Sequence, residues 1–187
     1  VELTSGGIHS RIVLAPGGAR TAVAWLPDGR RLAFIGIENG VRKVLIRDLA
    51  TDRVQAVPGT DGARALAVSP NGREVVFWAT DTLQRVGIDG GPVVSICAAG
   101  DVNGITWGPQ HIVFSQGALF MVEADQPKGF RSVTASHQFV RQSSPQLLPG
   151  ETAVLYTEYQ KHWTSGARRV MVLPLVPGSV PRVLLNQ

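Results

Sequence analysis

The stretch Ala24–Ile35, AWLPDGRRLAFI, decides the fold of this 187-residue chain. It contains a short apolar run, a Pro-Asp-Gly turn and a second apolar run. Proline presets φ at the first turn position, Asp28 can bond its own backbone, and Gly29 accepts a positive φ. The stretch therefore predicts two antiparallel strands joined by a tight turn.

Copies of this turn recur along the chain at a nearly constant interval. Successive turn prolines, Pro27, Pro70, Pro109 and Pro149, stand 43, 39 and 40 residues apart. A period of about 40–45 residues, filled by four short strands, is typical of β-propeller blades. No long segment with helical periodicity competes, so we expect almost no helix.

The repeat predicts an all-β protein: a β-propeller arc of four four-stranded antiparallel blades plus an extra N-terminal strand, in one domain spanning residues 1–187. We expect the extra strand at residues 11–15, because Ile12–Ala15 resembles the outermost strand of a blade whose other strands are missing. The blades are expected at about residues 20–58, 63–98, 103–135 and 143–187. Large side chains that recur in register with the turns are expected to fill the contacts between blades: Trp25, Phe34, Phe77, Trp107, Phe114, Leu148 and Tyr156.

Composition excludes several classes of protein. Hydrophobic residues make up 44% of the chain and charged residues 17%, as expected for a folded domain with a core. The net charge of +4 mildly favours anionic partners, but the absence of any Lys/Arg run and the 6% of aromatics argue against nucleic-acid binding. No apolar run approaches the ~18 residues of a membrane span. The single Cys97 excludes an internal disulfide, and its apolar neighbours predict a buried structural thiol.

Motifs that carry chemistry are missing from the sequence. There is no Gly-x-Ser-x-Gly elbow and no Gly-rich phosphate loop leading into a helix. The histidines His9, His111, His137 and His162 have no metal-ligand spacing, and His111, in a turn, is expected to face solvent. We therefore assign no catalytic residue, no metal ligand and no cofactor from the sequence.

Arginines recur at one point of the repeat. Three of them precede their turn prolines by six to eight residues, and an asparagine fills the slot in the third unit. Repeated blades would bring these positions to one rim, where guanidinium groups could hold a carboxylate or phosphate. The alternative is that they are solvated, or paired with Asp61 and Asp101. The candidate ligand-binding residues are Arg20, Arg64, Asn103 and Arg141.

The longest loop, Tyr159–Arg168, combines aromatic and basic residues of the kind enriched in interface hot spots. We expect it to contact a partner. The alternative is that Trp163 folds back over a blade edge or fills a dimer contact. The candidate partner-binding residues are Tyr159, Lys161, His162, Trp163 and Arg168.

Several segments resemble the WD-repeat-like blades of TolB-type bacterial β-propellers. The resemblance covers nearly the whole chain from Ile12. It implies the fold and leaves the ligand open, because such blades serve in binding, in scaffolding and as covers over catalytic domains. Complete propellers of this family usually carry six or more blades, and the third unit lacks the Asp-Gly of its turn. The segments that resemble TolB-type blades are Pro27–Phe34, Val44–Leu49 and Pro58–Thr60.

Four other segments are similar to the tandem blades of bacterial sensor proteins, including the extracytoplasmic parts of some serine/threonine kinases. These segments are Ser69–Arg73, Gly90–Pro92, Cys97–Ala98 and Trp107–Gly108.

Four blades leave open how the sheets at the two ends are covered. The chain could close as a small ring, pair with a second copy into one eight-bladed ring, or be part of a longer protein; we expect the homodimer.

The expected function is a non-enzymatic module for protein–protein interaction or ligand sensing. The alternatives are a propeller hydrolase or lyase, with acids at the channel mouth, and a fragment of a longer envelope sensor. An enzyme should bring together residues among Asp61, Asp101, His137 and Glu158. The resemblance implies the bacterial cell envelope on its periplasmic side, whereas the absence of a signal peptide favours the cytoplasm or a trimmed chain.

Overall fold

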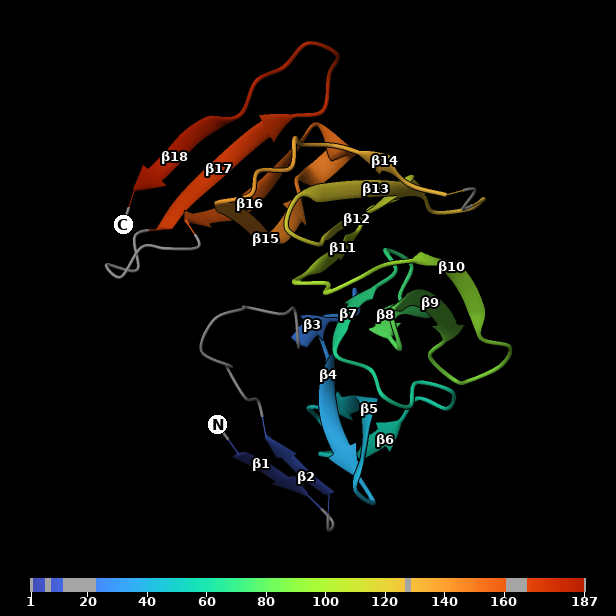
Figure 1. Ribbon diagram of the computed structural model, residues 1–187. Helices are drawn as coiled ribbons and strands as arrows, with labels where there is room; N and C mark the ends of the chain where they lie inside the picture. Colours follow the sequence, from blue (N-terminus) through green and yellow to red (C-terminus); the bar gives the residue numbers. More distant parts are fainter. Residues whose placement is uncertain (1, 6–7, 12–22, 127–128, 161–167, 187) are drawn as a thin grey trace.

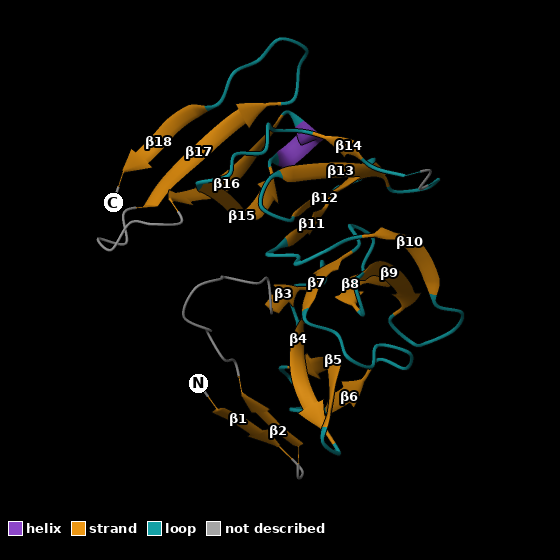
Figure 2. Cartoon of the chain, viewed as in Figure 1, coloured by secondary structure: helices purple, strands orange, loops and turns teal. Residues whose placement is uncertain are grey.

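The computed structural model describes residues 2–5, 8–11, 23–126, 129–160 and 168–186. Within these residues the chain is almost entirely β-structure, and the helical element is one three-residue 3₁₀ turn, Pro149–Glu151 (Figure 2). The strands form four antiparallel sheets that follow one another along the chain. Among the described residues, no helix is long and apolar enough to cross a bilayer.

The strands are distributed over the four sheets in chain order. The first sheet contains β1 (Glu2–Ser5), β2 (Ile8–Arg11), β3 (Val23–Trp25), β4 (Arg31–Glu38), β5 (Val41–Asp48) and β6 (Val54–Ala56). The second contains β7 (Ala65–Val68), β8 (Glu74–Ala79), β9 (Thr82–Gly87) and β10 (Val94–Ala98). The third contains β11 (Ile105–Trp107), β12 (His111–Ser115), β13 (Leu119–Glu123) and β14 (Arg131–Ser132). The fourth contains β15 (Val140–Leu147), β16 (Ala153–Gln160), β17 (Arg168–Pro174) and β18 (Arg182–Asn186).

The first sheet carries an N-terminal hairpin that the sequence did not predict. Strands β1 and β2 pair with each other, and β2 also pairs with β4 through His9 opposite Ile37. Strand β3 pairs with another part of β4. Of the strand predicted at residues 11–15, Arg11 ends β2 and the remainder lies outside the described residues.

The four sheets are successive blades of an arc (Figure 1). Their first strands, β3, β7, β11 and β15, contact one another in that order, and the remaining blade strands follow outward in chain order. In Figure 1 the first and fourth sheets stand at the two ends of this arc. The predicted all-β class and the arc of four four-stranded antiparallel blades are confirmed.

The Pro-Asp-Gly turn has the geometry expected from its residues. The Asp28 Oδ1 atom accepts hydrogen bonds from the backbone N–H groups of Arg30 and Arg31, at 2.9 and 3.0 Å. Gly29 has φ of 65°, in the left-handed region that glycine tolerates best. In the second sheet Asn71 Oδ1 accepts the corresponding bond from Arg73 N at 2.9 Å. Both turns are therefore capped by their own side chains.

Apolar side chains fill the spaces between successive sheets, and the burial along each strand shows which sheets are covered. In β8, five consecutive residues are buried, and in β12 four, so both faces of the second and third sheets are covered. In β17 burial alternates instead, and one face of the fourth sheet is therefore less covered than the other. The buried apolar side chains form three clusters, one between each pair of successive sheets. The cluster between the first and second sheets includes Ala33 and Phe77, and that between the second and third includes Trp78 and Ile112. The cluster between the third and fourth includes Met121 and Tyr156.

Most of the predicted contacts between blades are present, but those for Trp25 and Phe34 are wrong. Phe77, Phe114 and Tyr156 are at most 2% exposed and belong to the clusters between sheets, whereas Trp25 is 60% exposed. Phe34 is also buried, but it belongs to none of these clusters, because its neighbours Ala33 and Ile35 face the second sheet. Strand alternation explains the difference. Ala24 packs against the cluster shared with the second sheet, so its neighbour Trp25 must point to the opposite face of the first sheet.

Candidate functional site

Each sheet has two ends with different connections. The Pro-Asp-Gly-type turns, which join the first two strands of each blade, lie at one end together with the loops joining the last two; we call this the turn end. The middle hairpins and the segments that lead into the next sheet lie at the other end, which we call the rim end. The candidate ligand-binding residues Arg20, Arg64, Asn103 and Arg141 were predicted to lie at the rim end.

Two of the predicted ligand residues occupy equivalent positions at the rim end. Arg64, just before β7, donates its backbone N–H to the Trp78 carbonyl at 2.9 Å, and Asn103, just before β11, donates likewise to Ser115 at 2.8 Å. Arg64 is exposed, but Asn103 is 8% exposed and its Nδ2 donates to the Asp101 carbonyl at 2.8 Å. Asn103 therefore has a role in holding its own loop.

The third predicted arginine lies within a strand. Arg141 belongs to β15 and is half-buried, with its guanidinium over Gly117 in the β12–β13 turn: a Cβ atom on that glycine would stand 2.9 Å from Nη1. Arg20 lies outside the described residues. Anion binding at this rim stays a prediction.

The predicted partner loop is described only at its two ends. Tyr159 is half-buried near the end of β16, and it pairs across the hairpin with the exposed Arg168, which begins β17. Lys161, His162 and Trp163 lie outside the described residues.

The acidic set of the enzyme alternative is spread along the arc. Asp61, 70% exposed, makes an ion pair of 3.5 Å with Lys43 Nζ between the first and second sheets. Asp101 and His137 are exposed in the two segments that lead into the third and fourth sheets, and Glu158 is half-buried in β16. None of the four predicted residues lines either of the two pockets described next. An enzyme site formed by these residues stays a prediction.

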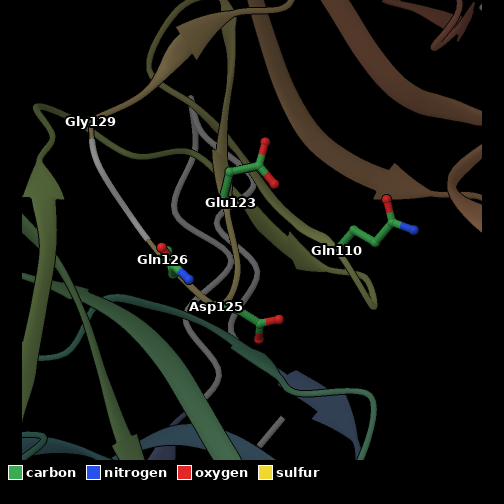
Figure 3. A pocket seen from close by; sticks show the side chains of 5 residues that line it. All are labelled: Gln110, Glu123, Asp125, Gln126 and Gly129. Carbon is green, nitrogen blue, oxygen red and sulfur yellow. The ribbon is translucent and has the colours of Figure 1, made fainter.

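The two pockets belong to the turn end, which the sequence did not single out. One, of about 490 Å³, lies on the third sheet and is lined by Gln110, Glu123, Asp125, Gln126 and Gly129. Figure 3 shows that the labelled side chains spread apart rather than converge on one point. Within the described part of the chain, no group of three His, Cys, Asp or Glu side chains has the arrangement of a metal site.

The second pocket, of about 580 Å³, lies between the first and second sheets. Ile46 and Ile88 provide apolar lining, and Arg31, Arg53, Gln55 and Asp89 are among the polar residues around them. This combination of an apolar base and a few polar groups is typical of small-molecule sites.

Glu151 connects the turns of the third and fourth sheets. Its Oε1 accepts hydrogen bonds from the backbone N–H groups of Gln110 and His111, at 2.7 and 3.1 Å, and its Oε2 lies 2.5 Å from His111 Nδ1. The other ring nitrogen of His111 lies 3.4 Å from Glu123. His111 is therefore half-buried between two carboxylates, and the expectation that it faces solvent is wrong.

Burial acts to raise the pKa of Glu151, but the hydrogen bonds from His111 and from the Gln110 backbone outweigh it, so the pKa is lowered. The carboxylate does for the third turn what Asp28 does for the first, since each accepts two backbone N–H groups. The sequence feature that could have indicated this contact is the absence of Asp-Gly from the turn of the third unit. That turn lacks the short acidic side chain that caps the first turn, so a residue from elsewhere has to supply the acceptor.

Comparison with known proteins identifies the fold. No family model and no curated protein matches the chain. Among solved structures, a TolB-like protein from Agrobacterium tumefaciens superposes with a TM-score of 0.74 at 17% identity, over 99% of this chain and 76% of that one. An oligogalacturonate lyase in complex with manganese gives 0.60 at 17% identity, over 91% of this chain and 53% of the lyase. A chain of a nidogen/laminin complex gives 0.71 at 14% identity, over 90% and 65%. The chain thus spans between about half and three quarters of these proteins and shares with them the β-propeller fold.

Proposed function

We propose that the chain is a non-enzymatic interaction module that covers the exposed apolar side chains of its two end sheets by pairing with a second copy of itself. The TolB-type resemblance of its turns and the TolB neighbour both support a bacterial propeller of that group. The oligomer is the part of the proposal that experiment can test first.

The alternating burial of the fourth sheet is the observation that carries this proposal. Met171 and Leu173 are buried against the third sheet, whereas Val170 and Val172, which point the other way, are half-buried. Leu185, opposite Val170 in β18, is 56% exposed. An apolar face of this kind gains free energy when another surface covers it.

The first sheet offers a complementary face at the other end of the arc. Trp25 and Val23 are 60% and 41% exposed, and both point away from the second sheet. Tryptophan is among the side chains most enriched in interface hot spots. On the same face Phe34, opposite Val23, is 1% exposed, so the exposed part lies around Trp25 and Val23. Two copies related by a two-fold axis could bring the fourth sheet of each against this part of the first sheet of the other, so one kind of contact would cover the exposed apolar side chains of both end sheets.

The test is the molar mass in solution across a range of protein concentration, measured by light scattering after size exclusion. We expect a mass near twice the 20.0 kDa of the chain. Val172→Lys and Trp25→Ala should each shift the protein to monomer, because each damages one side of the contact. Val176→Lys, in the β17–β18 loop and 61% exposed, is the matched control and should remain dimeric. A folded wild-type monomer at every concentration contradicts the proposal.

Mixing the two variants separates this arrangement from a symmetric contact between two fourth sheets. A mixed dimer of Val172→Lys and Trp25→Ala keeps one intact contact, so the mixture should associate more than either variant alone. Equal masses for the mixture and the separate variants contradict the head-to-tail arrangement.

Anion binding at the rim is a second candidate, favoured by the position of Arg141. Its guanidinium lies against Gly117 and, within the described part of the chain, forms no ion pair. Arg64 is exposed at the same end of the second sheet. Titration with inorganic phosphate should shift NMR resonances around Gly117, and Arg141→Gln should remove the shifts; unchanged shifts in that variant contradict this candidate.

A further inference from the structure

Two charged side chains that line the pocket between the first and second sheets form no ion pair within the part of the chain that the structure describes. Arg31 is paired with Asp28, with 2.6 Å between Nε and Oδ2, and Asp48 is paired with Arg30 at 2.8 Å. Asp48 also accepts two backbone N–H groups of its own loop. Two of the charged residues that line the pocket, Arg31 and Asp48, are therefore already paired within the protein.

The remaining two charges come from different sheets. Arg53 belongs to the segment between β5 and β6, and Asp89 to the segment between β9 and β10. Both residues are exposed, and within the described part of the chain neither takes part in an ion pair. Among the residues that the structure describes, the pocket thus presents one unpaired cation, Arg53, and one unpaired anion, Asp89, from neighbouring sheets.

The surface between these charges is apolar. Ile88 is 9% exposed in the cluster shared by the two sheets, and Ile46 packs against the same cluster. Gln55 stands opposite Ile46 in β6 and lines the pocket with a side-chain amide. A ligand that fits has an aliphatic part and carries a negative and a positive group.

We propose that this pocket binds a zwitterionic molecule of the α-amino acid type, with its carboxylate at Arg53, its ammonium group at Asp89 and its aliphatic part on Ile46 and Ile88. A free amino acid and a short peptide carry the same groups. The pocket lies on the side of the first sheet that faces the second, so it is separate from the outward faces proposed to pair two copies.

The experiment is an NMR titration of the whole chain with three probes: L-leucine, the tripeptide Gly-Leu-Gly and the uncharged N-acetyl-L-leucine amide. The backbone resonances of Thr51, Gln55 and Asp89 should shift and saturate in the millimolar range with at least one charged probe, and the uncharged probe should leave them in place. Saturation with leucine identifies a free amino acid, and saturation with the tripeptide alone identifies a peptide. Shifts that fail to saturate by about 20 mM, or equal shifts with the uncharged probe, overturn the proposal.

Charge-removing variants test the assigned roles. Arg53→Gln and Asp89→Asn should each weaken binding by about fivefold, as expected for the loss of one solvent-accessible ion pair. Arg73→Gln and Asp125→Asn are matched controls, since both residues are exposed and neither lines this pocket. Unchanged affinity in both pocket variants, with their circular dichroism spectra preserved, overturns the proposal.

Discussion

The contact between Glu151 and the third turn gives the most direct test of how the blades are held together. Replacing Glu151 with alanine removes the acceptor for two backbone N–H groups, those of Gln110 and His111, and the partner of His111 Nδ1. The Glu151 side chain is 9% exposed, so the contact is largely shielded from water. In the described structure both N–H groups bond to the Glu151 carboxylate and not to a side chain of the turn itself.

The expected cost follows from the number and type of bonds. A hydrogen bond to a charged group contributes about 1.5–3 kcal/mol. Gln110 is exposed and its N–H can return to water, whereas His111 is half-buried and cannot do so fully. We therefore expect Glu151→Ala to lower the free energy of unfolding by about 2–4 kcal/mol. Gly108→Ala should disturb the same contact, because the added Cβ would overlap Glu151 Oε1.

Backbone strain and pH provide two internal checks. Glu151 has φ of 53°, which glycine adopts more easily, so Glu151→Gly should be less destabilising than Glu151→Ala by up to about 1 kcal/mol. Because the folded-state pKa of Glu151 is lowered, its contribution is present above the ordinary pKa and is lost as pH falls through the folded value. The difference in stability between wild type and Glu151→Ala should therefore shrink in acid.

The assay is urea unfolding followed by circular dichroism at several pH values. Glu123→Ala is the matched control, since Glu123 contacts the other nitrogen of His111 but is 63% exposed, and it should cost less than about 0.5 kcal/mol. The reasoning is refuted if Glu151→Ala costs less than about 1 kcal/mol, or if the control costs as much.

The remaining predictions concern three buried or half-buried side chains, Tyr156, Thr60 and Cys97. The Tyr156 hydroxyl is buried and makes no hydrogen bond in the described part of the chain, so Tyr156→Phe should be neutral or stabilise by up to about 1 kcal/mol in thermal unfolding. Burial, with a smaller effect of the Glu158 charge, raises the pKa of Tyr156 to about 12. The hydroxyl therefore loses its proton at lower pH in the unfolded chain than in the folded one. The free energy of unfolding of the wild type should fall between about pH 10 and 12, and that of Tyr156→Phe should fall less. Thr60 is fully buried and its Oγ1 accepts a bond from Val44 N at 3.0 Å, so Thr60→Val should cost about 1–3 kcal/mol in urea unfolding, whereas Thr60→Ser should cost less. Burial raises the pKa of the Cys97 thiol, so alkylation by iodoacetamide at neutral pH should be slower in the folded chain than in urea; equal rates would contradict this.

The fold could be predicted because its decisive residues act locally. Pro27, Asp28 and Gly29 specify a turn through their own φ preferences and one side-chain acceptor, and the structure has that acceptor bonded as expected. Spacing then gave the number of blades. The β1–β2 hairpin was missed because no turn motif of the repeat marks it, although Gly6 and Gly7 separate its two strands.

The site residues were harder to predict because they depend on which face of a sheet is covered. Trp25 follows the same pattern as the buried aromatics, but at the first sheet its face points away from the second. His111 was placed in solvent because Glu151, its partner, is 40 residues away in sequence. A repeat pattern gives the equivalent positions, and it does not give the contacts that one unit makes with the next.

The shared turn between the third and fourth sheets limits how this chain could have grown by duplication. The first two blades cap their turns with their own Asp28 and Asn71, so a gene segment encoding either could be copied or exchanged with its turn intact. The third blade depends on a carboxylate that the fourth supplies. These two blades would have to be inherited together, and a recombination point placed between them would leave the third turn without its acceptor.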